Sequence, residues 1–307
     1  MQLINKGTEK AYAKINLGLR ICGKREDGYH LLDTVMQTIS LYDIVTVTFF
    51  SHEEEESFIP VRMSVSGASG IPLDEKNTAF RMAKSFFLLS NLKNHSIQID
   101  IDKKIPSEAG LGGASADAAA VLRLLMRFFP NEISEKDALL LCEKIGADVP
   151  FCYQQGIGRC TGIGENIQPL PPLSPLSVLL IKPPVGVSTP LAFSRFDQKY
   201  PDMYKRESEE ESMAMFDGSE KSFWKATGFL TNDLEAIAQT EHPVLCEIRT
   251  FLQKEGAGYT AMSGSGSCMF GIFSEKKACI SAKEKAEAAF PSTFFIYNCL
   301  LGEKRPL

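Results

Sequence analysis

The 307-residue chain lacks several patterns that would narrow its function at once. None of its eight cysteines form a CxxC pair, and its four histidines do not lie at the spacings of metal ligands. This argues against a zinc site and against a scaffold held together by disulfides. We expect the cysteines to be buried free thiols, as in a reducing cytosol.

Long hydrophobic runs are absent as well. The longest apolar stretches, such as 177–181, are far shorter than the roughly 20 residues that a membrane-spanning helix needs. The first seven residues lack the apolar segment of a signal peptide. We therefore expect no membrane partner and a cytoplasmic location.

Basic blocks are also missing. Lys and Arg number 33 against 38 Asp and Glu, so the formal net charge is −5. A mildly acidic chain without a basic patch is a poor nucleic-acid binder, so no nucleic-acid partner is expected. The length suggests about two domains. The proline-rich stretch 169–175 marks a plausible boundary, which predicts domains at 1–168 and 169–307.

Apolar periodicity predicts a mixture of strands and helices. Alternation with a period of two indicates strands, and apolar spacing of three to four residues indicates helices. The resulting fold class is α+β, with early strands that resemble hairpins. An acidic loop is expected at 53–56, a solvated charge run at 206–211, and a glycine-shaped hairpin at 156–164. The predicted strands cover 12–21, 43–50, 96–105, 176–182 and 294–299, and the main predicted helices cover 77–89, 114–129, 135–145, 243–255 and 276–289.

The strongest chemical signal is a glycine-rich turn between a predicted strand and a predicted helix. Its glycines let the backbone turn sharply and approach a ligand closely. Free N–H groups there, with the helix N-terminus, suit a phosphate group. A tight turn without a ligand is the alternative, and the chain lacks both GxxxxGK[ST] and GxGxxG. The turn consists of Pro106, Ser107, Glu108, Ala109, Gly110, Leu111, Gly112, Gly113, Ala114, Ser115 and Ala116.

Two further features favour a phosphate-handling site. Lys14 and Asn16 are two residues apart on a predicted strand, so their side chains point to the same face. A solvated strand-edge lysine is the alternative. Asp148 lies between small and apolar residues, where Pro150 is expected to keep Val149 extended and to end the preceding helix. A cap or turn residue is the alternative for Asp148, but with Lys14 it would form a base–cation pair.

These blocks resemble the GHMP kinase superfamily and, within it, the kinases of 4-diphosphocytidyl-2-C-methyl-D-erythritol. The resemblance extends in order over nearly the whole chain, and its DGYH and GADVPF blocks are more specific than the glycine-rich turn. The matching blocks are Ala13 to Leu17, Asp27 to His30, Gln37, Pro106 to Ala118, Gly146 to Phe151, Gly186 to Pro190, Asn232 to Glu235 and Met262 to Gly266.

The resemblance implies a two-domain kinase with its active site in the cleft between the domains. It implies ATP and Mg²⁺ as cofactors and a small-molecule substrate that carries a cytidine diphosphate group. The 2-hydroxyl of that substrate would receive the phosphoryl group, in the non-mevalonate pathway to isoprenoids. Because that pathway occurs in bacteria and plastids, the absence of a transit-like N-terminus favours a bacterial cytosol.

Roles for single residues also follow from the resemblance. The turn 106–116 would wrap the ATP phosphates, and Lys103 and Asn77 would lie near the adenine or ribose. Asp148 would be the general base, and Lys14 would stabilise developing charge on the γ-phosphate. The second substrate would be held by Asn16, Tyr29, His30, Thr189 and Phe193, with Gly264 and Gly266 facing the phosphates from the second domain.

The turn departs from the family pattern at one place. Relatives commonly show Gly-Gly-Gly-Ser-Ser, whereas this chain has Gly113-Ala114-Ser115-Ala116. The phosphate cradle should tolerate Ala114 if its φ is negative. Rival functions are another kinase of the superfamily, such as homoserine or mevalonate kinase, and a regulator that binds ligand without catalysis. On the bare sequence, Tyr29 could instead pack in the core, with His30 capping a turn.

Overall fold

The computed structural model describes residues 2–52, 60–201 and 216–302. The acidic loop expected at 53–56 and the charge run 206–211 lie outside these residues. Strands and helices mix as expected for α+β, and no described helix is long and apolar enough to cross a membrane. The described elements are β1 (Gln2–Lys24), β2 (His30–Ser51), β3 (Val61–Ser66), α1 (Thr78–Leu89), β4 (His95–Asp102), α2 (Gly113–Phe128), α3 (Glu135–Ile145), α4 (Val149–Gln154), β5 (Ile157–Gly162), β6 (Asn166–Pro169), β7 (Ser177–Lys182), α5 (Thr189–Lys199), α7 (Glu220–Ala226), α8 (Glu235–Glu241), α9 (Val244–Lys254), β8 (Tyr259–Met262), β9 (Met269–Phe273), α10 (Lys276–Ala289) and β10 (Phe295–Leu300).

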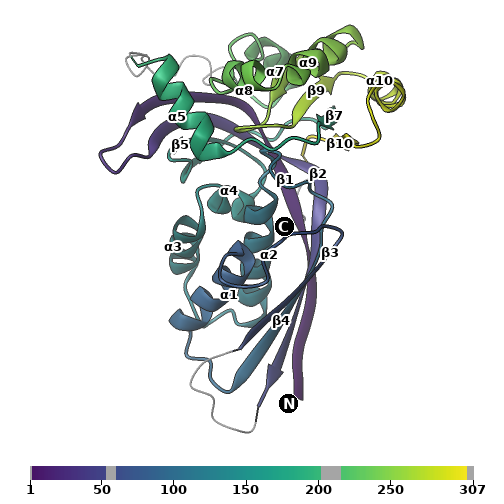
Figure 1. Ribbon diagram of the computed structural model, residues 1–307. Coiled ribbons are helices and arrows are strands. Elements are labelled where there is room, and N and C mark those ends of the chain that lie inside the picture. The colour runs from purple at the N-terminus through teal and green to yellow at the C-terminus, as the bar shows by residue number, and fades with distance from the viewer. Residues whose placement is uncertain (1, 53–59, 202–215, 303–307) are drawn as a thin grey trace. The chain divides into compact units, whose positions relative to one another are not determined.

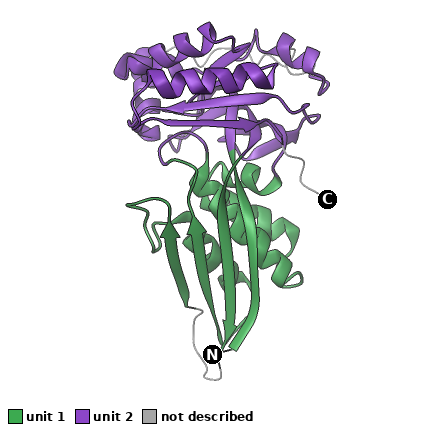
Figure 2. Cartoon of the chain, turned by 90° about the vertical axis from the view of Figure 1, so that its right-hand side faces the viewer, with its two compact units in different colours: residues 1–13, 41–106, 112–154 green, residues 14–40, 107–111, 155–307 purple. Residues whose placement is uncertain are grey.

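The chain divides into two compact units, each built from separate stretches of sequence. Unit 1 comprises residues 1–13, 41–106 and 112–154, and unit 2 comprises residues 14–40, 107–111 and 155–307 (Figure 2). This division follows spatial contacts rather than a linear cut. The boundary expected near residue 169 instead divides the sequence at a single point, and it stays a prediction.

Unit 1 is a sheet covered on one side by helices. The second half of β2 pairs antiparallel with β4, with Ile44 opposite Asp102, and β3 runs parallel to β4. Helices α1 to α4 gather on one side of these strands (Figure 1). The alternating apolar residues of β4, Ile97, Ile99 and Ile101, are buried in the core together with the alanine-rich face of α2. This is why α2 carries so many small residues: they let the helix pack closely.

Unit 2 contains a four-stranded antiparallel sheet in the order β10-β7-β9-β8. Its helices form a layer over strands (Figure 2), and the shared core includes Leu179 of β7, Ile248 of α9 and Ala282 of α10. The first half of β2 pairs with β5, and β5 pairs with β6, which confirms the glycine-shaped hairpin.

One local expectation was wrong. Val149 is not extended but is the first residue of α4, and its N–H donates to the Gly146 carbonyl at 3.0 Å. Pro150 is accommodated because the N–H groups of a first helical turn have no partner within the helix, so proline loses nothing there. The preceding helix, α3, does end at Ile145 as expected.

Candidate active site

The glycine-rich turn leads directly into α2, as the sequence predicts. Gly112 is the N-cap residue of α2 and has φ 70°, and Gly110 has φ 71°. Both values lie in the left-handed region that favours glycine. Ala114 is the second residue of α2, so its backbone is helical and its Cβ causes no strain. Gly112 offers no side chain to cap α2, so the N–H groups of the first turn are suited to bind an anion.

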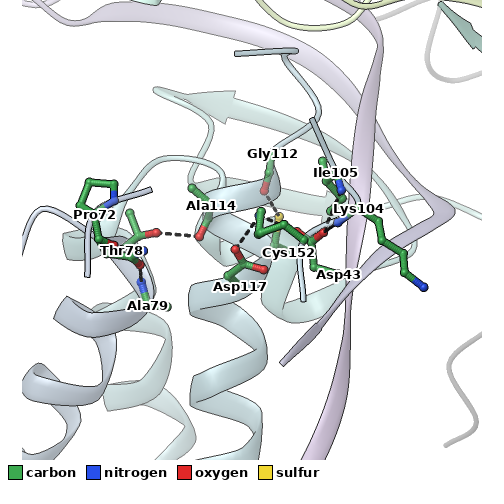
Figure 3. Close-up of polar contacts among 12 residues, drawn as sticks. Asp43, Pro72, Thr78, Ala79, Lys104, Ile105, Gly112, Ala114, Asp117 and Cys152 are labelled. Carbon is green, nitrogen blue, oxygen red and sulfur yellow. Dashed lines mark hydrogen bonds and ion pairs between the residues drawn. The ribbon is translucent and has the colours of Figure 1, made fainter. Parts of the chain in front are cut away.

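A buried ionic cluster lies beneath this turn. The Lys103 ammonium donates to Asp43 Oδ2 at 2.5 Å and to Asp117 Oδ2 at 2.7 Å, and all three side chains are almost fully buried. The other Asp43 oxygen accepts the backbone N–H groups of Lys104, at 2.5 Å, and Ile105, at 2.8 Å. Figure 3 shows Asp43 and Asp117 with the residues that lead into the turn. The cluster thus fixes the end of the segment that follows β4 against the first turns of α2.

The cluster holds two carboxylates but one ammonium. Burial raises the pKa of Asp117 to about 7, against the opposing pull of Lys103. Burial alone would lower the pKa of Lys103, but attraction to Asp117 and Asp43 outweighs it and raises that pKa. Asp117 Oδ1 is buried without a hydrogen-bond partner, so Asp117 is the surplus carboxylate of the cluster.

Lys103 and Asn77, expected near the nucleotide base or sugar, both have structural partners in unit 1. Asn77 is the N-cap of α1: its Oδ1 accepts from Ala79 N at 2.9 Å, and its Nδ2 donates to the Pro72 carbonyl at 2.9 Å. The Lys103 ammonium is engaged with its two aspartates. A contact of either side chain with a nucleotide stays a prediction.

In unit 2, Lys14 and Asn16 point to the same side of β1, as the period of two predicts. Lys14 Nζ donates to Asn16 Oδ1 at 2.7 Å, and both residues are buried. The Asn16 amide donates in turn to Thr34 Oγ1 at 2.8 Å. Lys14 is therefore not a solvated strand-edge lysine.

A second glycine-containing loop, 263–266, packs against residues 107–111 within the same unit. The Ser263 hydroxyl donates to the Gly110 carbonyl at 2.8 Å and accepts from Asn16 N at 3.2 Å. The amide of Asn232 donates to the carbonyls of Met262 and Gly264, each at 2.8 Å. Gly264 and Gly266 have φ values of 56° and 94°. Ser263 and Asn232 thus hold the loop 263–266 in place by hydrogen bonds. Asn232 belongs to the block Asn232 to Glu235, so this block has a structural role.

Of the residues expected at a pyrimidine site, His30 and Phe193 are in contact. His30 Nε2 lies 2.7 Å from Asp197 Oδ1, and its ring stacks on Phe193 with ring centroids 4.6 Å apart. Tyr29, in the turn before β2, is 60% exposed. That exposure rules out the alternative in which Tyr29 packs in the core.

Thr189 and Asp148 lie at the starts of α5 and α4. Thr189 is the first residue of α5, and its hydroxyl lies 2.7 Å from that of Ser265. Asp148 directly precedes α4, and its carbonyl accepts from Cys152 N at 3.0 Å. Its side chain is half-buried in unit 1.

Three polar partners were not foreseen from the sequence: Asp43, Thr34 and Asp197. A local signal was present for Asp197, which lies four residues after Phe193 and so on the same face of a helix. Asp117, Asn232 and Ser263 lie in the blocks that carry the resemblance, but only the structure shows which groups they contact.

The described residues hold no group of three or more His, Cys, Asp or Glu that could bind a metal ion. Mg²⁺ often needs only one or two protein ligands, because it keeps waters and binds substrate phosphates. The donors present, such as the Ser115 hydroxyl in the first turn of α2, fit an ion that arrives with a nucleotide.

Comparisons with known proteins place the chain in a family. The model of the GHMP kinases N terminal domain matches residues 77–156, and that of the GHMP kinases C terminal matches residues 221–292. A 4-diphosphocytidyl-2-C-methyl-D-erythritol kinase of Caldicellulosiruptor bescii is 36% identical over 94% of this chain and 97% of its own. One of Clostridium tetani is 37% identical over 93% of this chain and 97% of its own.

Solved structures agree. A crystal structure of 4-(cytidine 5'-diphospho)-2C-methyl-D-erythritol kinase has a TM-score of 0.75 and 30% identity, covering 97% of this chain and all of that one. A homoserine kinase from Cytophaga hutchinsonii has a TM-score of 0.71 but 18% identity, with 97% of this chain and 95% of that one covered, and shows a shared fold only. With identities of 36% and 37% to curated relatives along almost its entire length, the chain belongs to the 4-diphosphocytidyl-2-C-methyl-D-erythritol kinase family of the GHMP kinases.

Proposed function

We propose that this protein transfers the γ-phosphoryl group of ATP to the 2-hydroxyl of 4-diphosphocytidyl-2-C-methyl-D-erythritol, a step of the non-mevalonate route to isoprenoids. The observation that carries this proposal is the match to kinases of that name along nearly the whole chain. The buried Lys14–Asn16 pair and the glycine-rich turn before α2 support it, because phosphoryl transfer depends on positioning and charge stabilisation.

In the proposed reaction, the substrate oxygen forms a bond to the γ-phosphorus while the bond to the ADP oxygen breaks. Asp148 accepts the hydroxyl proton. Lys14 stabilises the negative charge that spreads over the γ-phosphoryl oxygens, and the N–H groups at 110–116 hold the phosphates. The Ser115 hydroxyl would be a candidate ligand for Mg²⁺ bound with the nucleotide, which would supply further positive charge at those oxygens.

Tyr29 and His30 are proposed to select the cytidine group. The exposed Tyr29 ring offers a stacking surface for a pyrimidine, and Asp197 and Phe193 hold the His30 ring. Thr189 lies on the same helix as Phe193, at its start. Gly264 and Gly266 are proposed to face the phosphates from the loop that packs on 107–111.

The direct test is ADP release from MgATP with three acceptors in parallel: diphosphocytidyl-methylerythritol, homoserine and mevalonate. We expect turnover on the cytidyl substrate alone. Turnover on another acceptor would overturn the assignment of Tyr29 and His30. No ADP release with any of the three acceptors, while ATP still binds, would favour a regulator without catalysis.

Two substitutions test the chemistry. Lys14→Met should lower kcat by ~10²-fold or more, which corresponds to roughly 3 kcal/mol of transition-state stabilisation. Asp148→Asn should also reduce kcat severely, because the amide accepts no proton. Circular dichroism spectra of both variants serve as the control for correct folding. A folded Asp148→Asn enzyme with near wild-type kcat would refute the base assignment, and a Lys14→Met effect confined to KM would refute the role of Lys14.

A further inference from the structure

The Asn16 side chain connects a buried lysine to a buried threonine. Lys14, Asn16 and Thr34 are 3%, 2% and 1% exposed. Lys14 Nζ lies 2.7 Å from Asn16 Oδ1, and Asn16 Nδ2 lies 2.8 Å from Thr34 Oγ1. Thr34 Oγ1 lies 2.6 Å from the Gly18 carbonyl oxygen. The chain of contacts therefore runs from β2 to the ammonium group on β1.

The hydrogen atoms in this series of hydrogen bonds can be assigned from the number of donors that each group has. A carbonyl oxygen only accepts, so the single hydroxyl hydrogen of Thr34 must point to Gly18. Toward Asn16, Thr34 Oγ1 can then only accept. The NH₂ group of Asn16 therefore faces Thr34, and its oxygen faces Lys14. A flipped amide would place two donors against each other at Lys14 and two acceptors against each other at Thr34.

The backbone of Asn16 is held by hydrogen bonds outside this series of side-chain contacts. Its N–H donates to the Ser263 hydroxyl at 3.2 Å, and Lys14 N donates to the Leu111 carbonyl at 3.0 Å. With the backbone fixed, the orientation of the Asn16 amide decides whether its oxygen or its NH₂ group faces the Lys14 ammonium. That orientation is set by the Thr34 hydroxyl.

We propose that Thr34 is a positioning residue, which holds the Lys14 ammonium in its working place by orienting the amide of Asn16. The inference rests on the proposed function, because it assumes that Lys14 acts on the transferred phosphoryl group. Thr34 would then affect the chemical step itself, in addition to stabilising the folded protein through a buried hydrogen bond.

The first test is Thr34→Val, which keeps the shape of the side chain and removes the hydroxyl. We expect kcat for ADP release to fall about tenfold, or roughly 1.4 kcal/mol, while KM for ATP stays within about twofold. Thr34→Ser restores the hydroxyl and should return kcat to within about threefold of wild type. Should Thr34→Val fail to fold, Thr34→Ala removes the same hydroxyl without a second methyl group.

Thr38→Val is the matched control. Thr38 lies on the same strand, is 3% exposed, and its hydroxyl accepts from Gly156 N at 3.0 Å. The control loses a buried hydrogen bond of similar kind, so its Tm should fall about as much as that of Thr34→Val, but its kcat should be unchanged. If Thr34→Val is no slower than Thr38→Val, or if Thr34→Ser is as slow as Thr34→Val, the inference is overturned.

A double-mutant cycle separates this inference from the proposed function. If Thr34 acts through Lys14, Thr34→Val should slow the Lys14→Met enzyme by less than about twofold. A full tenfold loss in that background would refute the inference and leave the role of Lys14 intact. Wild-type turnover of Lys14→Met alone would instead refute the proposed role of Lys14, and with it this inference.

Discussion

Tyr29 and its neighbour His30 have opposite surroundings, although they are adjacent in the chain. Tyr29 is 60% exposed, whereas the His30 ring is held between Phe193 and Asp197. An exposed aromatic ring offers a surface on which a base can stack. This arrangement favours a recognition role for the pair over a structural one.

Tyr29→Ala should therefore weaken the cytidyl substrate selectively. Stacking of a base on an aromatic ring contributes ~1–3 kcal/mol, so KM for that substrate should rise about 5- to 150-fold. KM for ATP should stay within about twofold. Initial rates with each substrate varied separately provide the measurement. Tyr297→Ala, at another exposed tyrosine, should change neither constant, and equal rises in both KM values for Tyr29→Ala would mark Tyr29 as structural.

Sequence reasoning succeeded for side chains whose neighbours are local. The period of two placed Lys14 beside Asn16, and the structure joins them by a hydrogen bond. The partners of Lys103 could not be foreseen in this way. Asp43 is 60 residues away, and it meets Lys103 because Ile44 pairs with Asp102 in the register of β2 and β4.

The loop 107–111 contains a single glycine, Gly110, and its conformation depends on that residue. Gly110 has φ 71°, and a Cβ there would overlap the carbonyl oxygen of Ser263. Gly110→Ala should displace the loop 263–266 or the turn itself, so Tm and ATP affinity should both fall. Gly70→Ala is the matched control, since Gly70 has φ 73° but open space around its missing Cβ.

The left-handed backbone alone costs an alanine roughly 1–2 kcal/mol. Thermal unfolding should show that modest loss for Gly70→Ala and a clearly larger one for Gly110→Ala. Nucleotide titration should show weaker binding for Gly110→Ala only. Equal losses in the two variants would mean that the approach of Ser263 is unimportant.

Most helices and strands could be predicted from apolar spacing, and the expectation that was wrong, at Val149, concerned a proline. Pro150 and Pro190 both lie in the first turns of helices, α4 and α5. Proline is favourable there for the same reason that it is unfavourable inside a helix: it has no N–H to donate. A proline in sequence therefore marks a helix boundary without showing on which side the helix lies.

For the molecule as a whole, the buried cluster under α2 makes stability depend on pH. The folded protein raises the pKa of Asp117 to about 7, above its ordinary value near 4, so it binds that proton more tightly than the unfolded chain does. Stability from this group is greatest below pH 4 and declines as the pH rises to about 7. Asp117→Asn cannot titrate and removes this decline.

Urea unfolding at pH 5 and pH 8 measures the effect. Wild type should lose more unfolding free energy between these pH values than Asp117→Asn does. Asp74→Asn, at an exposed carboxyl group, controls for the removal of one negative charge and should keep the wild-type dependence. The same pH dependence in Asp117→Asn and wild type would show that Asp117 ionises normally.

The discontinuous make-up of the two units has a consequence for synthesis on the ribosome. Residues 14–40 leave the exit tunnel early, yet they belong to a unit completed only by residues 155–307. The backbone N–H of Asn16 cannot form its native hydrogen bond until Ser263, 247 positions later, has been synthesised. Contacts so distant in sequence form slowly. Nascent chains that stall midway would therefore expose unpaired strand edges, a state that is prone to aggregate.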